Sequence, residues 1–389
     1  MDIDARIERR QRRDDGHLLV RDYEALSPVV HTDEPSGRGP AVERLLDHLD
    51  PVFDGVLPPN AYVHGPFGAG KSAVVTALFA GLERLSTGQG AIHTSTRAAT
   101  PGTPGFAYVD MRETASEFAF YHAVLDGLVE ERVPEHGIGT ADLRERLGAL
   151  LAGRSGAVVA VDHVGEPDDT DTEELIDLFA GLPSNVSWLA VGRASPEETE
   201  LTTYTATAVR LDPYRRGALV DVLMTRAAAG LAQGGLEHRL ARRIAEWAAG
   251  NAHDALAALF VAADTAERAE RTRVMEHDVD GAIGEVPERS VSLARVLALP
   301  ANKQLVLRAL VDLDPEERAT VAATTEAISA EPSVDLSQGT VKRFLYEMAE
   351  LGIVERVRSE RESGKGRPPS RLELRFAPSA FRRLYDLRQ

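Results

Sequence analysis

The chain contains no cysteine, which excludes disulfides, thiol catalysis and cysteine-ligated zinc. Lysine is almost as rare, because only four of the 44 basic residues are lysines: Lys71, Lys303, Lys342 and Lys365. Aromatic residues make up 5% of the chain, and no apolar run approaches the roughly 20 residues that span a membrane. The polar start also lacks the apolar stretch of a signal peptide. We therefore expect a soluble, cytoplasmic protein that binds no membrane.

The excess of acidic residues is the main feature of the composition. There are 61 Asp and Glu against 44 Lys and Arg, a net charge of −17. A dense acidic surface with arginine in place of lysine is typical of proteins that work in concentrated salt. A GC-rich genome would explain the shortage of lysine but not the excess of acid. The composition therefore favours a halophilic source.

The charge is unevenly distributed along the chain. Residues 336–389 contain 12 of the basic and 7 of the acidic residues, a net +5, which leaves 32 basic and 54 acidic residues elsewhere. A basic end on an acidic body predicts contact with a polyanion at that end.

The pattern of short runs predicts an α/β core. Between residues 45 and 209, β-rich runs such as "AYVHG", "GFAYVDM", "AVVAVDH" and "SWLAVG" alternate with helical runs such as "SAVVTALFAGLERL". This alternation is typical of a parallel, doubly wound sheet. The polar, Gly- and Thr-rich residues 86–105 are expected to form an exposed loop.

Two further parts follow the core. Residues 215–282 are helical throughout, and from residue 292 three helices precede two extended runs around a Gly/Pro-rich tip and a last short helix. At roughly 150 residues per domain, the 389 residues suit two or three domains. The expected division is a flexible segment (1–17), a core (18–212), a helical lid (213–284) and a C-terminal domain (292–389).

The phosphate loop is the most specific motif. Residues 65–72, "GPFGAGKS", match G-x-x-x-x-G-K-[ST] between a predicted strand and a predicted helix. Such a loop turns its backbone N–H groups toward phosphate oxygens, while its Lys neutralises the β/γ-phosphates and its Ser ligates Mg²⁺. The residues expected to contact the nucleotide here are Gly65, Pro66, Phe67, Gly68, Ala69, Gly70, Lys71, Ser72 and Ala73.

A second element of the site is the apolar strand "GAVVAVDH". It places Asp162 at its carboxyl end, where an acid can hold Mg²⁺ beside the phosphate loop. We expect Ser72 and Asp162 to share the metal, and ATP or ADP with Mg²⁺ to be the cofactor. An ordinary buried strand capped by an Asp is the alternative.

The ordered segments resemble the archaeal origin-recognition/cell-division-control initiators, AAA+ ATPases with a C-terminal winged helix. The similarity lies in "LLVRDYEALSPVV", the Arg-containing box and phosphate loop that follow it, "FAYVDMR", "LDPYRRGALVDVLMTRAAAGL" and "AGNAHDALAALFVAAD". It spans residues 18–376 and implies a AAA+ P-loop core, an all-helical lid and a winged helix. The resemblance also implies further nucleotide contacts: Val29, Val30, Arg38, Tyr214 and Arg226. Tyr214 can instead be a core aromatic, and Arg226 a solvated charge.

The chain departs from this family at three positions. His163 stands where the family has the Glu that activates water, Ser195 stands where a sensor Asn is expected, and His253 replaces the sensor Arg. A positioned base contributes roughly 10²–10⁴-fold and an arginine roughly 10³–10⁵-fold. The resemblance therefore implies binding of the nucleotide with slow or absent hydrolysis, and Asp162 and His163 are the candidate catalytic residues. A neutral His163 or Glu166 could still act as the base, and Arg193 or Arg210 could supply the missing charge.

The C-terminal part predicts a DNA-binding surface. "LSQGTVKRFLYEMAELGIVERV" has the pattern of a recognition helix, capped by Ser337, and a first wing strand. Gln and Arg suit bidentate contacts with adenine and guanine. The candidate DNA contacts are Gln338, Thr340, Lys342, Arg343, Lys365, Arg367 and Arg371. The alternatives are a protein-docking winged helix and a merely solvated basic hairpin.

The sequence as a whole predicts a nucleotide-dependent replication initiator that binds double-stranded origin DNA in the nucleoid. A replicative helicase and other initiator copies are candidate partners. Two alternatives stay open: a transcriptional or plasmid regulator with a vestigial ATPase module, and a AAA+ motor or signalling ATPase whose winged helix contacts protein. The altered His163, Ser195 and His253 argue against the motor.

Overall fold

The computed structural model describes residues 19–90, 104–114, 116–152, 155–166, 172–358 and 370–388. Its contacts divide the chain into two compact units. We call His31–Tyr214 the sheet unit, and Arg215 onward together with the described residues before His31 the helical unit. Within the described ranges, none of the helices has the length and apolar character needed to cross a bilayer.

The sheet unit is built on five parallel strands in the order β2-β3-β4-β1-β5. The strands are β1 (Ala61–His64), β2 (Gly105–Asp110), β3 (Ala157–Val164), β4 (Val186–Gly192) and β5 (Thr207–Arg210). Asp110 lies beside Asp162 in the register, so the acidic ends of β2 and β3 meet at the carboxyl edge of the sheet. The expected doubly wound α/β fold is confirmed.

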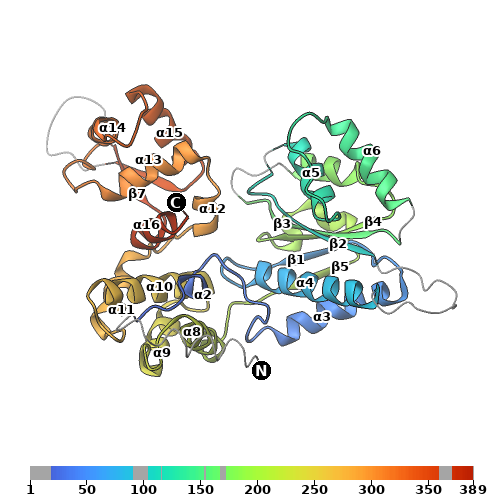
Figure 1. Cartoon of the computed structure of the whole chain (residues 1–389), viewed down its shortest axis with the longest axis horizontal. Helices are drawn as coiled ribbons and strands as arrows, with labels where there is room; N and C mark the ends of the chain where they lie inside the picture. The colour runs from blue at the N-terminus through green and yellow to red at the C-terminus, as the bar shows by residue number, and fades with distance from the viewer. Residues whose placement is uncertain are drawn as a thin grey trace. The chain divides into compact units, whose positions relative to one another are not determined.

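Helices cover both faces of this sheet (Figure 1), and their core residues form two separate clusters. The helices and short 3₁₀ turns are α3 (Gly39–Leu49), η2 (Asp50–Asp54), α4 (Lys71–Gly90), α5 (Glu117–Asp126), α6 (Thr140–Leu151), α7 (Thr172–Ala180), η3 (Pro196–Glu198) and η4 (Glu200–Tyr204). The Val- and Ala-rich β3 is buried on both sides, as expected of a central parallel strand. α4 continues to Gly90, so residues 86–90 are helical rather than part of the expected loop.

The first part of the helical unit is a bundle around the buried helix α10. It consists of α2 (Tyr23–Leu26), α8 (Arg216–Gly230), α9 (His238–Trp247), α10 (Ala252–Arg268) and α11 (Glu276–Glu285). Residues 19–30 belong to this bundle: Val20 forms an antiparallel bridge with Leu231, and Glu267 Oε2 accepts from the N–H groups of Leu19 and Val20 at 2.7 and 2.9 Å. The sheet unit therefore begins after residue 30, whereas the sequence predicted a core that begins at residue 18.

The second part of the helical unit has winged-helix architecture. It contains α12 (Leu293–Leu297), α13 (Ala301–Asp312), α14 (Val321–Ala330), α15 (Gln338–Glu350), the antiparallel strands β6 (Val354–Arg358) and β7 (Ser370–Leu374), and α16 (Pro378–Asp386). α15 begins as predicted, because the Ser337 side chain accepts from the N–H of Thr340.

Buried polar contacts join the two parts of the helical unit. Asp264 on α10 is 3% exposed, and its carboxylate accepts from Tyr23 at 2.9 Å and pairs with Arg383 of α16 at 3.4 Å. The N–H of Leu293, at the start of α12, donates to Nε2 of His253 at 3.0 Å. A buried charge in such a cluster costs free energy if its partners are removed, so these contacts fix the two parts to each other.

Candidate functional site

The phosphate loop forms the expected turn between β1 and α4. Gly65, Gly68 and Gly70 have φ values of +151°, +73° and +74°, which favour glycine. α4 begins at Lys71, so the positive end of a long helix and the N–H groups of the loop face the carboxyl edge of the sheet. The structure thus brings the predicted residues from Gly65 to Ala73 together in one loop, and their contact with phosphate stays a prediction.

Gly65 is required for packing as well as for loop conformation. A Cβ at this position would lie 2.1 Å from the carbonyl oxygen of Leu211, which follows β5. At Gly70, a Cβ would lie 2.6 Å from the hydroxyl of Tyr214. Both glycines therefore allow the end of β5 to pack against the phosphate loop.

We expect Gly65→Ala to lower the free energy of unfolding of the sheet unit by about 2–4 kcal/mol, because backbone atoms must move to admit the methyl group. Urea unfolding followed by Trp188 fluorescence, in a Trp247→Phe background, measures this loss. The matched control is Gly148→Ala in α6, where nothing lies within 4 Å of the added Cβ. That variant should gain about 0.5–1 kcal/mol. Equal stability of the two variants would contradict the packing role of Gly65.

Lys71 is buried within the loop. Its ammonium group donates to the carbonyl oxygens of Gly65 at 2.8 Å and Pro66 at 3.0 Å. Burial lowers the pKa of Lys71 to about 8, although Asp162 opposes the shift. The side chain lies along the loop, as the predicted phosphate contact requires.

Asp162 and Ser72 meet beside Lys71. The Ser72 hydroxyl donates to the Asp162 carboxylate, and the Tyr108 hydroxyl donates to Asp162 Oδ2 at 2.6 Å. Burial alone would raise the pKa of Asp162, but His163 and these hydrogen bonds lower it, so the group is ionised. A hydroxyl and a carboxylate are ligand types that suit Mg²⁺ together with phosphate oxygens. In the described ranges, no group of three or more His, Asp or Glu forms a metal site by itself.

His163 occupies the position after Asp162 in an unusual conformation. Its φ is +65°, at a register shift of β3 against β4, which re-aims the side chain. Nδ1 lies 2.9 Å from Glu166 Oε1, and Nε2 lies 3.7 Å from Asp162 Oδ2. Burial opposes protonation, yet Asp162 and Glu166 raise the pKa of His163. Its imidazole is thus held between carboxylates.

Arg193 completes this cluster. It follows β4, its Nη2 lies 2.9 Å from Glu166 Oε1, and its guanidinium stacks 4.6 Å from the ring centroid of Phe67 in the phosphate loop. Glu166 is 6% exposed; burial opposes its ionisation, but His163 and Arg193 lower its pKa to about 2. The part-buried pair Asp110–Arg112 lies at the end of the neighbouring strand β2.

Arg38 and Tyr214 form a second wall next to the loop. Arg38 is 7% exposed, and its guanidinium stacks 3.6 Å from the centroid of the Tyr214 ring. Its Nε and Nη2 have no hydrogen-bond partner among the described residues. Buried, unpaired guanidinium donors close to Lys71 fit a site for an anion. The residues present are therefore compatible with a bound triphosphate.

Four other predicted nucleotide contacts lie in the helical unit, whereas the phosphate loop belongs to the sheet unit. The Arg226 guanidinium donates to the carbonyl oxygens of Ala25, at 3.0 Å, and Val30. The N–H of the neighbouring Val29 donates to Ser27 Oγ at 3.4 Å. His253 contacts Leu293 and Asp254. Contact of these four with the nucleotide stays a prediction.

Ser195, one of the three positions that depart from the family, makes local hydrogen bonds within the sheet unit. Its N–H and hydroxyl both donate to Glu198 Oε2 at 2.9 Å, which caps η3. Its role as a sensor also stays a prediction.

The exposed side of α15 carries the predicted DNA contacts. Val341, Leu345 and Met348 are buried, whereas Gln338, Lys342 and Arg343 are exposed. The remaining candidates behave as follows: Thr340 lies 3.0 Å from the Ser337 hydroxyl, Arg371 pairs with Glu373 at 2.6 Å, and Lys365 and Arg367 lie outside the described residues.

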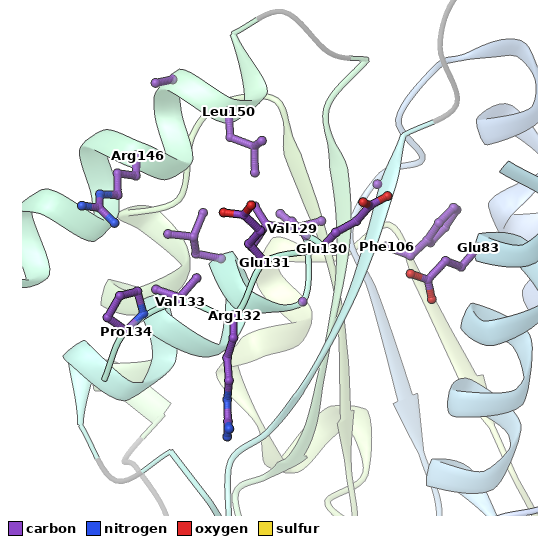
Figure 2. A pocket seen from close by; sticks show the side chains of 15 residues that line it. Glu83, Phe106, Val129, Glu130, Glu131, Arg132, Val133, Pro134, Arg146 and Leu150 are labelled. Carbon is purple, nitrogen blue, oxygen red and sulfur yellow. The ribbon is translucent and has the colours of Figure 1, made fainter. Parts of the chain in front are cut away.

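A separate cavity of about 880 Å³ lies at the other end of β2, where Gly105 and Phe106 begin the strand. Figure 2 shows its lining, which includes Glu83 of α4, residues 129–134 after α5, and Arg146 and Leu150 of α6. Because β2 ends at Asp110 on the carboxyl edge, this cavity is distinct from the phosphate loop. None of the predicted site residues that the structure describes lines it.

Comparison with known proteins agrees with this geometry. A model of an AAA ATPase domain matches residues 34–191, and a model of a Cdc6 AAA+ ATPase-type lid domain matches residues 220–284. ORC1-type DNA replication protein 1 of Aeropyrum pernix is 27% identical over 384 residues, which cover 90% of this chain and 91% of that protein. ORC1-type DNA replication protein 8 of Halobacterium salinarum is 24% identical over 376 residues, 90% of each chain.

Solved structures show the same fold. The Aeropyrum pernix ORC1 protein, determined in complex with DNA, has a TM-score of 0.63 at 24% identity and covers 94% of this chain and 96% of its own. Cdc6p from Pyrobaculum aerophilum has a TM-score of 0.53 at 19% identity, with 95% and 99% covered. The chain is therefore an AAA+ protein with a helical lid and a C-terminal winged helix. Within that class, it belongs to the archaeal ORC1/Cdc6-type family of DNA replication proteins.

The sequence did not reveal several residues of the site. Tyr108 and Asp110 lie in β2, where the alternation of "FAYVD" places them on one face, and Arg112 follows the strand. That signal alone could not show that β2 pairs with β3, which is what brings them to Asp162.

Proposed function

We propose that the protein is a replication initiator that binds ATP or ADP with Mg²⁺ in the sheet unit and origin DNA through α15 and the hairpin β6–β7. The observation that supports this proposal best is the contact of the Ser72 hydroxyl with Asp162 beside a complete phosphate loop. Ser72 and Asp162 would hold Mg²⁺, which neutralises phosphate charge when bound. Lys71 and Arg38 would bind the phosphates.

Hydrolysis is proposed to be slow or absent. At the position where the family carries a water-activating Glu, the chain has His163, whose Nδ1 is already bound to Glu166. The hydroxyl of Ser195, at the position expected for the sensor, donates to Glu198 Oε2 at 2.9 Å. Without a base, roughly 10²–10⁴-fold of rate is lost. The nucleotide then acts as a bound regulator of DNA binding rather than as a fuel.

The DNA-binding part of the proposal rests on α15. Its first turn is capped and exposed, and Gln338, Lys342 and Arg343 present donors of the kinds that contact base edges and phosphates. The related ORC1 protein of Aeropyrum pernix was determined in complex with DNA, which supports the same role here. A nucleoid location and contact with a replicative helicase or further initiator copies are consistent with this role.

The proposed slow or absent hydrolysis of ATP can be measured as phosphate release. With saturating ATP and Mg²⁺, we expect turnover below about one per minute, at least 10²-fold slower than the median enzyme rate of about 10 s⁻¹. Lys71→Ala provides the background, because it removes the phosphate-binding ammonium. Steady phosphate release well above that background would contradict the proposal. Mapping of bound DNA across the genome then separates an initiator, with a few origin-proximal sites, from a regulator with many promoter sites.

A further inference from the structure

Arg193 lies next to the phosphate loop, but the phosphate-loop motif gives it no role. It follows β4, the strand that lies between β3 and β1 in the sheet. β1 leads into the phosphate loop, and β3 carries Asp162 near its carboxyl end. Arg193 therefore emerges between the two elements that define the site, and its side chain is 33% exposed rather than fully enclosed.

The contacts of Arg193 locate it on the metal side of the site. Its guanidinium lies over Phe67 of the loop at 4.6 Å and reaches Glu166, which also holds His163, the neighbour of Asp162. In phosphate-loop proteins, the Ser and the Asp mark the position of the ion that bridges the β- and γ-phosphates. Arg38 and Tyr214, by contrast, pack at Gly70, where α4 begins. The position of Arg193 is thus the one expected for a ligand of the terminal phosphate.

The way Glu166 holds Arg193 leaves donors for another anion. Glu166 Oε1 accepts from both His163 and Arg193, while Oε2 is buried and has no hydrogen-bond partner among the described residues. The pair is therefore not the bidentate arrangement that would use both edges of the carboxylate. A guanidinium has five N–H donors in a rigid fork, so one contact to Glu166 orients the group without exhausting it.

We propose that Arg193 binds the terminal phosphate of a nucleoside triphosphate within the same chain and that Glu166 positions it, so that Arg193 distinguishes ATP from ADP. This inference rests on the proposed nucleotide-binding function and extends it to a residue that selects the nucleotide. It also gives a chain with altered sensor positions a means of responding to the γ-phosphate.

Arg210 is a suitable comparison, because it is the last residue of the parallel strand β5, at the same carboxyl edge of the sheet as Arg193. Its guanidinium pairs with Asp212 at 2.8 Å, and its side chain is 66% exposed. The phosphate loop packs against Leu211 and Tyr214 instead. Arg210→Gln is therefore a matched control for Arg193→Gln: each removes one guanidinium from an Arg–carboxylate pair at the end of a strand.

Binding of ATPγS and ADP, each with Mg²⁺, tests the proposal by titration calorimetry. We expect Arg193→Gln to weaken ATPγS binding about 10- to 100-fold, the effect of losing a charge-assisted hydrogen bond, and to change ADP binding by less than about threefold. Arg193→Lys should recover part of the preference for ATPγS, and Arg210→Gln should retain all of it. A parallel loss of both nucleotides in Arg193→Gln would overturn the assignment.

A second set of variants separates phosphate binding from simple support of the fold. Glu166→Gln frees Arg193 from its carboxylate but keeps the guanidinium, so the preference for ATPγS should be kept or increased. The double variant Arg193→Gln/Glu166→Gln leaves no unpaired buried charge at this pair and should still lack the preference. If the double variant regained the preference for ATPγS, that result would contradict the role of Arg193. If the wild-type protein binds neither nucleotide, the proposed nucleotide-binding function is wrong, and this inference is wrong with it.

Discussion

Lys71→Ala is expected to weaken the binding of both ATP and ADP by 100-fold or more. Lys71 is 9% exposed, and its ammonium group lies within the loop, where it donates to the carbonyl oxygens of Gly65 and Pro66. Alanine removes the cation that faces the phosphates, and a charge-assisted hydrogen bond is worth about 1.5–3 kcal/mol, or roughly 10- to 100-fold in affinity. Loss of the two carbonyl contacts that order the loop adds to this effect.

Titration with a fluorescent ATP analogue and with its ADP counterpart measures the loss. Lys303→Ala is the control, because Lys303 belongs to α13 of the helical unit and pairs with Glu347 at 2.9 Å. Unlike Arg193→Gln, Lys71→Ala should affect the two nucleotides alike. A Lys71→Ala protein that still binds ATP within threefold of wild type would show that the phosphate loop is not the nucleotide site.

The double replacement Gln338→Ala/Arg343→Ala is expected to reduce affinity for specific duplex DNA by roughly 30-fold or more. Each bidentate contact with a base is worth about 1–3 kcal/mol. Both side chains are exposed, and the ion pair of Arg343 with Glu347, at 3.8 Å, is too long to hold the guanidinium strongly. Binding to unrelated duplex should change much less, because phosphate contacts supply that affinity.

The size of the loss in DNA affinity should also depend on salt concentration. The affinity that phosphate contacts provide falls with a slope of about −0.9 per contact in log–log terms, so in molar KCl base contacts must carry a larger share. Fluorescence anisotropy at low and at molar KCl should therefore show a larger relative loss at high salt. Arg242→Ala, an exposed charge on α9, is the control. Unaltered specific binding by the double variant would favour a winged helix that docks protein.

The parts of the fold predictable from sequence are those encoded in local patterns. The phosphate loop, the strand that carries Asp162 near its carboxyl end and the cap of α15 by Ser337 each depend on neighbouring residues. α6, α11, α12 and β5 were not predicted individually, because α6 is charged and α12 and β5 are short, with four or five residues. Residues 86–90 were assigned to a loop for their Gly and Thr content, yet the regular helix before them continues.

The parts of the site that sequence could not give depend on contacts between distant segments. Tyr108 reaches Asp162 only because β2 and β3 are neighbours in the sheet. Arg193 and Arg210 look equivalent in sequence, each an arginine at the end of a β-run, and only tertiary structure separates them. Residues 19–30 precede the core in sequence but bond to α8 and α10, since the ends of those helices offer a bridge partner in Leu231 and an acceptor in Glu267.

The chain passes between its two units twice, after Val30 and after Tyr214. Each crossing adjoins a fixed point: Arg226 binds the carbonyl oxygen of Val30, and Tyr214 is wedged between Arg38 and Gly70. At both crossings, the last residue before the change of unit is therefore held by side chains of the unit that it leaves.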